Sequence, residues 1–314
     1  MRVLLTGATG FVGSHMVKKL LSEGYEVGCL VRDVAKAARV LGSEVKVYRV
    51  DFEDKKSLKK AFEEFEPEAL VHLVGILLED KRRGQTFMRV HYLYSKHLYE
   101  VARDYGRLKS VAHMSSLGTH KNAPSLYHRT KYMAEEELRK SGASYCIMRP
   151  SLILGPEQKL FYDLWSITKY IRIMALPDGG MYLFQPVDVR DVACAFVKAL
   201  EVRESEGKTY ELCGSKRVSF RELLEDIFES WKRRMVFLPL PKRLMYLGGL
   251  FVERLMHHPP FTSDQMLMMW RDNVCGLDED VEKEGINKLC GREPISYEES
   301  LRWSLEEFRR RLNA

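Results

Sequence analysis

A serine, a tyrosine and a lysine near the middle of the chain are residue types that together can move a proton to or from a substrate oxygen. They are Ser116, Tyr127 and Lys131, with Ser115 as the alternative serine. A tyrosine, whose ordinary pKa is about 10, can act as acid and base at neutral pH if a nearby ammonium stabilises its phenolate. Lys131 would lower the pKa of Tyr127 in this way, while the serine hydroxyl orients the substrate oxygen as a hydride moves. We therefore predict that these residues are catalytic.

The tyrosine-lysine spacing is not selective by itself, because it occurs three times. The pairs are Tyr92/Lys96, Tyr105/Lys109 and Tyr127/Lys131. A pair four residues apart shares a face only on a continuous helix, and Gly106 interrupts the second pair. The first pair precedes a predicted strand and lies away from any ligand-binding edge. Only the third follows a strand that ends in Ser115-Ser116, so it is favoured over the alternative of an exposed helical pair without function.

The beginning of the chain predicts a binding turn for the pyrophosphate of a dinucleotide. A buried strand at Val3 to Thr6 leads directly into three glycines and then into a helical pattern. Glycines at these places allow a tight turn, unshielded backbone amides and a close approach of helix to strand. The candidate binding residues in this turn are Gly7, Thr9, Gly10, Phe11, Val12 and Gly13. The alternative is a glycine-rich turn before an ordinary helix.

The residue that closes the second strand distinguishes the two nicotinamide dinucleotides, because it faces the adenosine ribose. Arg32 stands there and would pair with a 2′-phosphate, which favours NADP(H). Asp33 follows and keeps NAD(H) as the alternative. A solvated charge at the strand end is the alternative interpretation of Arg32.

Further candidates for cofactor binding lie at the ends of later strands. Asp51 would accept a hydrogen bond from the adenine amino group while Phe52 flanks the ring, although an aspartate here is also a common helix cap. Leu73, Val74 and Gly75 end the next strand, where a glycine lets the backbone approach the dinucleotide. Lys131 would also hold the nicotinamide ribose.

Alternating strand and helix signals predict an α/β fold with a doubly wound parallel sheet of the Rossmann type. The predicted strands are Val3 to Thr6, Val27 to Val31, Val45 to Val50, Ala69 to Val74, Ser110 to Met114, Ser144 to Met148 and, later, Thr209 to Cys213. A helix is predicted at Leu160 to Met174, and another opens at Val187 to Val192. We assign residues 1–155 plus about 186–213 to the dinucleotide-binding domain. Residues about 156–185 plus 214–314 form a smaller, mostly helical lobe for substrate or a partner, over the edge where ligands bind.

Composition excludes several classes of protein. The 314 residues include 50 basic and 44 acidic ones, a net charge of +6 without the long basic block expected of a nucleic-acid-binding arm. Six cysteines without a Cys-x-x-Cys pair indicate a reduced cytosol. No secretory leader and no run of about 18 apolar residues is present, which predicts a cytoplasmic protein. Few glutamines and asparagines beside many lysines and glutamates give a thermophile-like composition.

Two segments of the C-terminal half have weaker signals. Leu244 to Val252 is an apolar run with basic neighbours, too short to span a bilayer. It predicts a helix that covers the small lobe, with peripheral contact to the inner face of a membrane or to a partner as the alternative. His257-His258-Pro259-Pro260 has no partner ligands at useful spacing, so we predict no metal site.

These motifs, in this order, resemble those of extended and atypical short-chain dehydrogenase/reductases, a group that includes NAD-dependent epimerases and dehydratases. The resemblance rests on the glycine turn, Asp51-Phe52, Ser115-Ser116, Tyr127/Lys131 and Arg149-Pro150 through Gly155-Pro156, and covers nearly the whole chain. It implies that residues Pro150 to Ile153 line the nicotinamide, with Pro150 and Ile153 among the cofactor-binding residues.

Within that group the chain is similar to the branch of the NADPH-binding accessory subunit of respiratory NADH:quinone oxidoreductase. The similarity is carried by Val90-His91, Tyr127 to Lys131, Phe261 to Gln265 and Arg271 to Val274. His91 replaces the asparagine of many short-chain enzymes, which puts their usual proton relay in doubt here.

We therefore expect an NADP(H)-binding oxidoreductase or epimerase that acts on a carbonyl or hydroxyl of a small molecule. A non-catalytic nucleotide-binding subunit of a membrane redox complex is the first alternative, and a sugar-nucleotide epimerase or dehydratase is the second. The sequence identifies neither the substrate nor the oligomeric state.

Overall fold

Seven parallel strands form one sheet at the centre of the computed structural model, which describes residues 1–202, 205–256, 259 and 261–313. Their order is β11-β6-β5-β4-β1-β2-β3, and every neighbouring pair is parallel. The strands are β1 (Arg2–Thr6), β2 (Glu26–Val31), β3 (Lys46–Arg49), β4 (Ala69–His72), β5 (Ser110–Met114), β6 (Tyr145–Pro150) and β11 (Lys208–Leu212). The predicted doubly wound α/β fold is thus confirmed, and each of the seven predicted strands is present.

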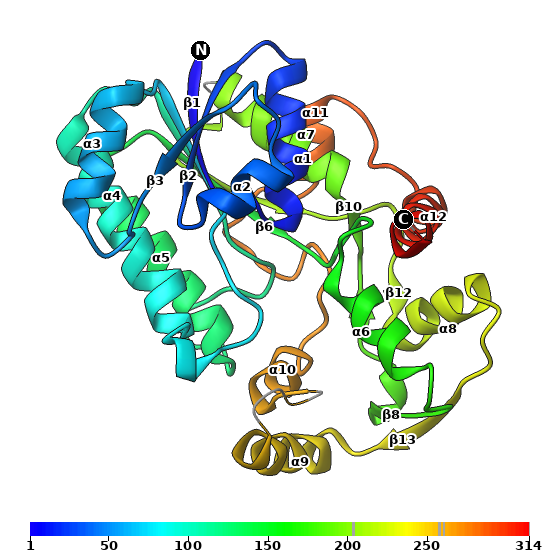
Figure 1. Cartoon of the computed structure of the whole chain (residues 1–314). Coiled ribbons are helices and arrows are strands. Elements are labelled where there is room, and N and C mark those ends of the chain that lie inside the picture. The colour runs from blue at the N-terminus through cyan, green and yellow to red at the C-terminus, as the bar shows by residue number, and fades with distance from the viewer. Residues whose placement is uncertain (203–204, 257–258, 260, 314) are drawn as a thin grey trace.

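Helices cover both faces of this sheet, which explains why its strands are almost continuously apolar. One face carries α1 (Phe11–Ser22), α7 (Val189–Glu201) and α11 (Gly285–Cys290), while the other carries α3 (Lys55–Phe65), α4 (Tyr94–Tyr105) and α5 (Leu126–Lys140), as Figure 1 shows. A short helix, α2 (Val34–Val40), follows β2, and the π-helical turn η2 (Met88–Leu93) runs directly into α4. Because all seven strands are parallel, their carboxyl ends lie at one edge of the sheet.

A second core holds the smaller lobe together. Aromatic and aliphatic side chains pack between α6 (Lys159–Ile167), α8 (Phe220–Ser230) and α12 (Tyr297–Asn313). The remaining elements are β7 (Ile153–Leu154), β8 (Ile173–Pro177), β9 (Leu183–Phe184), β10 (Val187–Asp188), β12 (Val218–Ser219), β13 (Val236–Leu240), α9 (Lys242–Leu255), α10 (Ser263–Met268) and the 3-10 turns η1 (Lys81–Arg83) and η3 (Asp178–Gly180). The predicted helix over the apolar run is confirmed as α9. The domain boundaries stay a prediction.

One predicted helix is too long. The helix expected at Leu160 to Met174 ends at Ile167, and residues 173–177 form β8, which pairs with β13 in parallel. Local periodicity does not reveal this ribbon, because its two strands lie about 60 residues apart in sequence and stabilise each other only after folding. The sequence predicts no metal site at residues 257–260, and three of these residues, His257, His258 and Pro260, lie outside the described residues.

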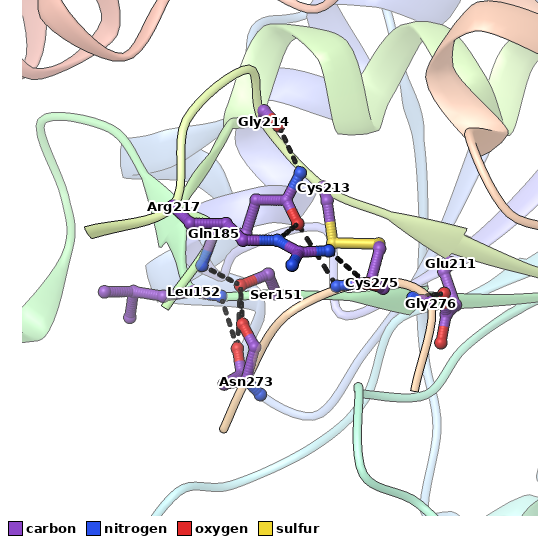
Figure 2. The surroundings of a disulfide bond; sticks show 10 residues. All are labelled: Ser151, Leu152, Gln185, Glu211, Cys213, Gly214, Arg217, Asn273, Cys275 and Gly276. Carbon is purple, nitrogen blue, oxygen red and sulfur yellow. Dashed lines mark hydrogen bonds between the residues drawn. A yellow bond between two sulfur atoms is a disulfide. The ribbon is translucent and has the colours of Figure 1, made fainter. Parts of the chain in front are cut away.

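A disulfide bond corrects the expectation that all six cysteines are reduced. Cys213, just after β11, is bonded to Cys275, and the two lie 62 residues apart in sequence. Figure 2 shows that Cys275 also donates its amide to the side chain of Gln185. The bond therefore ties the segment around Cys275 to the end of β11. Within the described residues, no helix is both long and apolar enough to cross a membrane.

Candidate active site

The glycine turn has the geometry that a pyrophosphate requires. Gly7 has φ +73°, a conformation that L side chains rarely adopt. A Cβ on Gly13 would lie 2.7 Å from Cα of Ala8 and closer still to the carbonyl oxygen of Gly7, so only glycine lets α1 approach this turn. Gly10 is the N-cap residue of α1 and supplies no side-chain cap, and the first turn of α1 contains no acidic residue. The N-terminus of α1 therefore keeps free amides and a positive dipole end for an anion.

One cavity of about 340 Å³ brings this turn together with the predicted catalytic residues. Its lining includes most of the predicted site, namely Gly7, Gly10, Phe11, Val12, Gly13, Leu73, Gly75, Ser115, Ser116, Tyr127, Lys131, Pro150 and Ile153. It lies where β1, β4, β5 and β6 end, which is the edge at which open α/β sheets bind ligands. Thr9, Arg32, Asp51, Phe52 and Val74 do not line this cavity.

The outer strand ends have different surroundings from those the sequence suggested. Asp33 caps α2, its carboxylate accepting from the amide of Lys36 at 2.9 Å, while Arg32 is exposed at the end of β2. Asp51 is exposed beyond β3. Phe52 differs from the expectation of a ring beside adenine, because its ring is 2% exposed and stacks on Tyr94 in the core.

Local sequence explains how the helix α5 presents Tyr127. Ser125 caps α5 through a hydrogen bond from the amide of His128, which places Tyr127 in the first turn. Tyr127 is 8% exposed, and the Ser116 side chain acts on its hydroxyl in the direction that lowers the pKa of the tyrosine. Both candidate serines are hydrogen-bonded to Oγ1 of Thr119, Ser115 at 3.3 Å and Ser116 at 3.1 Å, and Ser116 is the one that also acts on the hydroxyl of Tyr127.

The electrostatics of the pair differ from the expectation that Lys131 lowers the pKa of Tyr127. Burial raises the pKa of Tyr127, although the interaction with Ser116 opposes this shift. Lys131 is also buried, donates to the carbonyl of Met114 at 3.0 Å, and has its pKa lowered by burial to about 8. Desolvation is the largest cause of both pKa shifts. At neutral pH Tyr127 is therefore a neutral phenol, and Lys131 is mostly protonated but close to its pKa.

His91 occupies the place next to this pair. It belongs to the π-helical turn η2, a type of turn that is frequent at functional sites, and its ring lies edge-on to that of Tyr127 at 5.2 Å. Its Nδ1 lies 2.9 Å from Oγ1 of Thr130, and its Nε2 lies 3.0 Å from the carbonyl oxygen of Ile76. Burial lowers the pKa of His91 well below its usual value, so the imidazole is neutral.

Gly75 has a role beyond the one predicted. A Cβ at this position would lie 3.0 Å from Nζ of Lys131 and 3.7 Å from Nε2 of His91. Gly75 therefore leaves room for the buried lysine.

Asp264, within the segment Phe261 to Gln265, is a site residue for which the sequence predicts no role. It lies on α10, and its carboxylate accepts from the amides of Leu126 at 2.6 Å and Tyr127 at 3.1 Å. These amides are at the open N-terminus of α5, where a carboxylate is favourable. The small lobe thus fixes the helix that carries Tyr127, and burial raises the pKa of Asp264. No local signal reveals this contact, because 138 residues separate Asp264 from Leu126.

We expect Asp264→Ala to lower the free energy of unfolding by about 1 kcal/mol, the usual cost of losing a helix cap. Asp264→Asn should lose less, because an amide oxygen can still accept one hydrogen bond. Asp280→Ala is the control, since Asp280 is exposed. Denaturant unfolding measures all three, and an Asp264→Ala protein as stable as the parent would contradict the capping role.

The parallel sheet, the glycine turn at the start of α1 and the cavity at the carboxyl edge define a nucleotide-binding protein of the Rossmann class. The model of the NAD dependent epimerase/dehydratase family matches residues 3–213, and the chain belongs to this family.

Known proteins agree with this assignment. The chain is 32% identical over 244 residues to the mitochondrial NADH dehydrogenase [ubiquinone] 1 alpha subcomplex subunit 9 of Arabidopsis thaliana, covering 75% of this chain and 60% of that protein. The chain thus spans less than two thirds of that relative.

Two solved structures have the same fold. One is UDP-glucose 4-epimerase of Thermus thermophilus in complex with NAD, with TM-score 0.70, 22% identity and coverage of 98% of this chain and 99% of that one. The other is an NADPH-dependent quinone oxidoreductase of Escherichia coli in complex with NADPH, with TM-score 0.71, 20% identity and coverage of 96% and 98%.

Proposed function

We propose that this protein binds NADP(H) and transfers a hydride between it and a carbonyl or hydroxyl carbon of a small molecule. The observation that carries the proposal is that Ser116, Tyr127 and Lys131 line the same cavity as the glycine turn. Residues of this turn would hold the pyrophosphate, because Gly13 lets the N-terminus of α1 lie directly against the turn. The nicotinamide would supply or accept the hydride.

Side chains of the protein would transfer the proton that accompanies the hydride. Tyr127 and Ser116 line the same cavity and Ser116 acts on the hydroxyl of Tyr127, so a substrate oxygen placed between them would receive hydrogen bonds from both hydroxyls. Because burial keeps Tyr127 protonated, it would begin as the acid, which suits reduction of a carbonyl. Lys131 has its pKa lowered to about 8 and would hold the nicotinamide ribose and return a proton to the tyrosine.

Arg32 and Asp33 support NADP(H) over NAD(H). The carboxylate of Asp33 is engaged as the cap of α2, so it is less able to bind a ribose hydroxyl. Arg32 is exposed at the end of β2 and could pair with a 2′-phosphate. NAD(H) remains the alternative cofactor, because one of the two solved structures of this fold contains NAD and the other contains NADPH.

We expect Arg32→Ala to weaken NADPH binding by about tenfold or more, roughly 1.4 kcal/mol, with little effect on NADH. The physical reason is the loss of a charge-assisted contact to the 2′-phosphate. Titration of both nucleotides measures the effect, and Arg39→Ala on the exposed face of α2 is the matched control. Equal losses for NADPH and NADH would contradict the assignment.

The activity itself is tested by identifying the nucleotide that co-purifies with the protein and then mixing NADPH-loaded protein with a panel of aldehydes, ketones and quinones. Oxidation of the nicotinamide with stoichiometric reduction of a carbonyl would support the proposal. Tight NADPH binding without turnover on any member of the panel would instead favour the second candidate function.

That second candidate is a non-catalytic NADPH-binding accessory or assembly subunit of a membrane NADH:quinone oxidoreductase. The similarity to the Arabidopsis subunit supports it. The two candidate functions predict different effects of removing the Tyr127 hydroxyl. An enzyme would lose activity, whereas a structural subunit would keep its function.

A further inference from the structure

The helix α9 presents an unusual row of exposed apolar side chains. Leu244, Leu247, Phe251 and Leu255 are 55%, 59%, 65% and 67% exposed, and their spacing of three and four residues places them on one stripe. The opposite side of α9 is anchored to α10, because Gly249 is buried and a Cβ there would lie 2.7 Å from the amide nitrogen of Ser263. The stripe therefore points away from the lobe.

The β8–β13 ribbon, which leads directly into α9, also exposes apolar side chains. Ile173, Val236 and Leu238 are 54%, 55% and 47% exposed, and Ile173 and Val236 are paired in register. Figure 1 shows α9, β13 and β8 at the end of the small lobe that is remote from the large sheet. We call the exposed part of residues 168–181 and 232–256 the basic apolar face. It contains 12 of the 23 large hydrophobic residues that are exposed among the described residues.

The same two segments account for the net positive charge of the protein. They contain eight basic and two acidic residues, a surplus of six that equals the net charge of the whole chain. Both carboxylates have hydrogen-bond donors: Asp178 accepts from the backbone amide of Lys242 at 2.9 Å and has the ammonium of that lysine at 3.7 Å, and Glu253 accepts from the Ser263 hydroxyl. Six of the eight basic residues are exposed, whereas Arg233 and Lys242 are half-buried. The rest of the chain is therefore formally neutral.

We propose that the basic apolar face docks on an anionic lipid bilayer. An apolar stripe beside exposed cations is the pattern of a helix that lies in a membrane interface, where the apolar side chains enter the acyl boundary and the cations contact headgroups. The 14 residues of α9 are too few to span a bilayer. A second copy of the chain is disfavoured as the occupant, because it would bring two surfaces with a surplus of six positive charges together.

The experiment is flotation of the full-length protein with vesicles of phosphatidylcholine mixed with phosphatidylglycerol, compared with vesicles of phosphatidylcholine alone. We expect about tenfold or greater preference for the anionic vesicles, reduced by added salt. The double variant Leu247→Glu with Phe251→Glu should abolish flotation, and Arg243→Glu with Arg254→Glu should remove the preference for anionic lipid. Val40→Glu, a charge placed on an exposed residue of α2, is the matched control and should float like the parent.

Thermal unfolding and NADPH titration verify that each variant is folded, and Tyr127→Phe should float normally whatever its activity. Absence of binding to anionic vesicles would overturn the proposal, as would equal flotation of the Leu247→Glu, Phe251→Glu variant. Self-association that these two substitutions disperse, without vesicle binding, would assign the face to a second copy. Capture of an acidic protein without vesicle binding would also overturn it.

Discussion

Tyr127→Phe is expected to reduce hydride transfer by about 10²–10⁴-fold, the usual contribution of a positioned acid or base. Nucleotide binding and folding should be retained. The ring of Tyr127 packs edge-on against Phe87 and His91, contacts that phenylalanine preserves, so the change removes only the hydroxyl and its interaction with Ser116. Single-turnover oxidation of bound NADPH by the best carbonyl substrate measures the effect.

Tyr132→Phe is the matched control for this experiment. Tyr132 lies on the same helix, next to Lys131, but it does not line the cavity that holds Tyr127. Its variant should keep the parent rate. A Tyr127→Phe protein that turns over at the parent rate would eliminate the acid role, and it would leave the accessory-subunit function as the better candidate.

The fold and the nucleotide turn could be predicted because their causes are local. Strands buried on both faces need apolar runs, and the close approach of α1 to β1 requires glycines at Gly7 and Gly13, so both leave a continuous signature in the sequence. Three tyrosines have a lysine four residues later, and Tyr127 is distinguished from the other two by the strand that ends at Ser115-Ser116 just before it. That argument also depends on neighbouring residues.

The parts that could not be predicted depend on residues far apart in the chain. The contact from Asp264 to the start of α5 spans 138 residues, and the Cys213–Cys275 disulfide closes a separation of 62. Phe52 was misjudged for a related reason, because its ring turns into a core that Tyr94 completes. The raised pKa of Tyr127 has the same origin, since burial is a property of the folded molecule rather than of the motif.

Gly13→Ala is expected to weaken binding of NADPH and NADH alike, by about a hundredfold or more, equivalent to roughly 2.7 kcal/mol. The added Cβ would press on Cα of Ala8 at 2.7 Å and on the carbonyl of Gly7, both of which are backbone atoms that cannot rotate away. The N-terminus of α1 would have to move from the turn, which also lowers the free energy of unfolding by about 1–3 kcal/mol. Nucleotide titration and denaturant unfolding measure the two losses.

Two other glycines supply graded controls for this prediction. A Cβ on Gly10 would lie 3.2 Å from the carbonyl oxygen of Gly7, so Gly10→Ala should have a smaller effect on binding. Gly42 has no atom within 4 Å of such a Cβ and no positive φ, so Gly42→Ala should leave binding unchanged. If Gly13→Ala bound nucleotide as well as Gly42→Ala, the pyrophosphate could not lie on this turn. A loss confined to NADPH would likewise contradict the assignment, because the turn contacts the part that the two cofactors share.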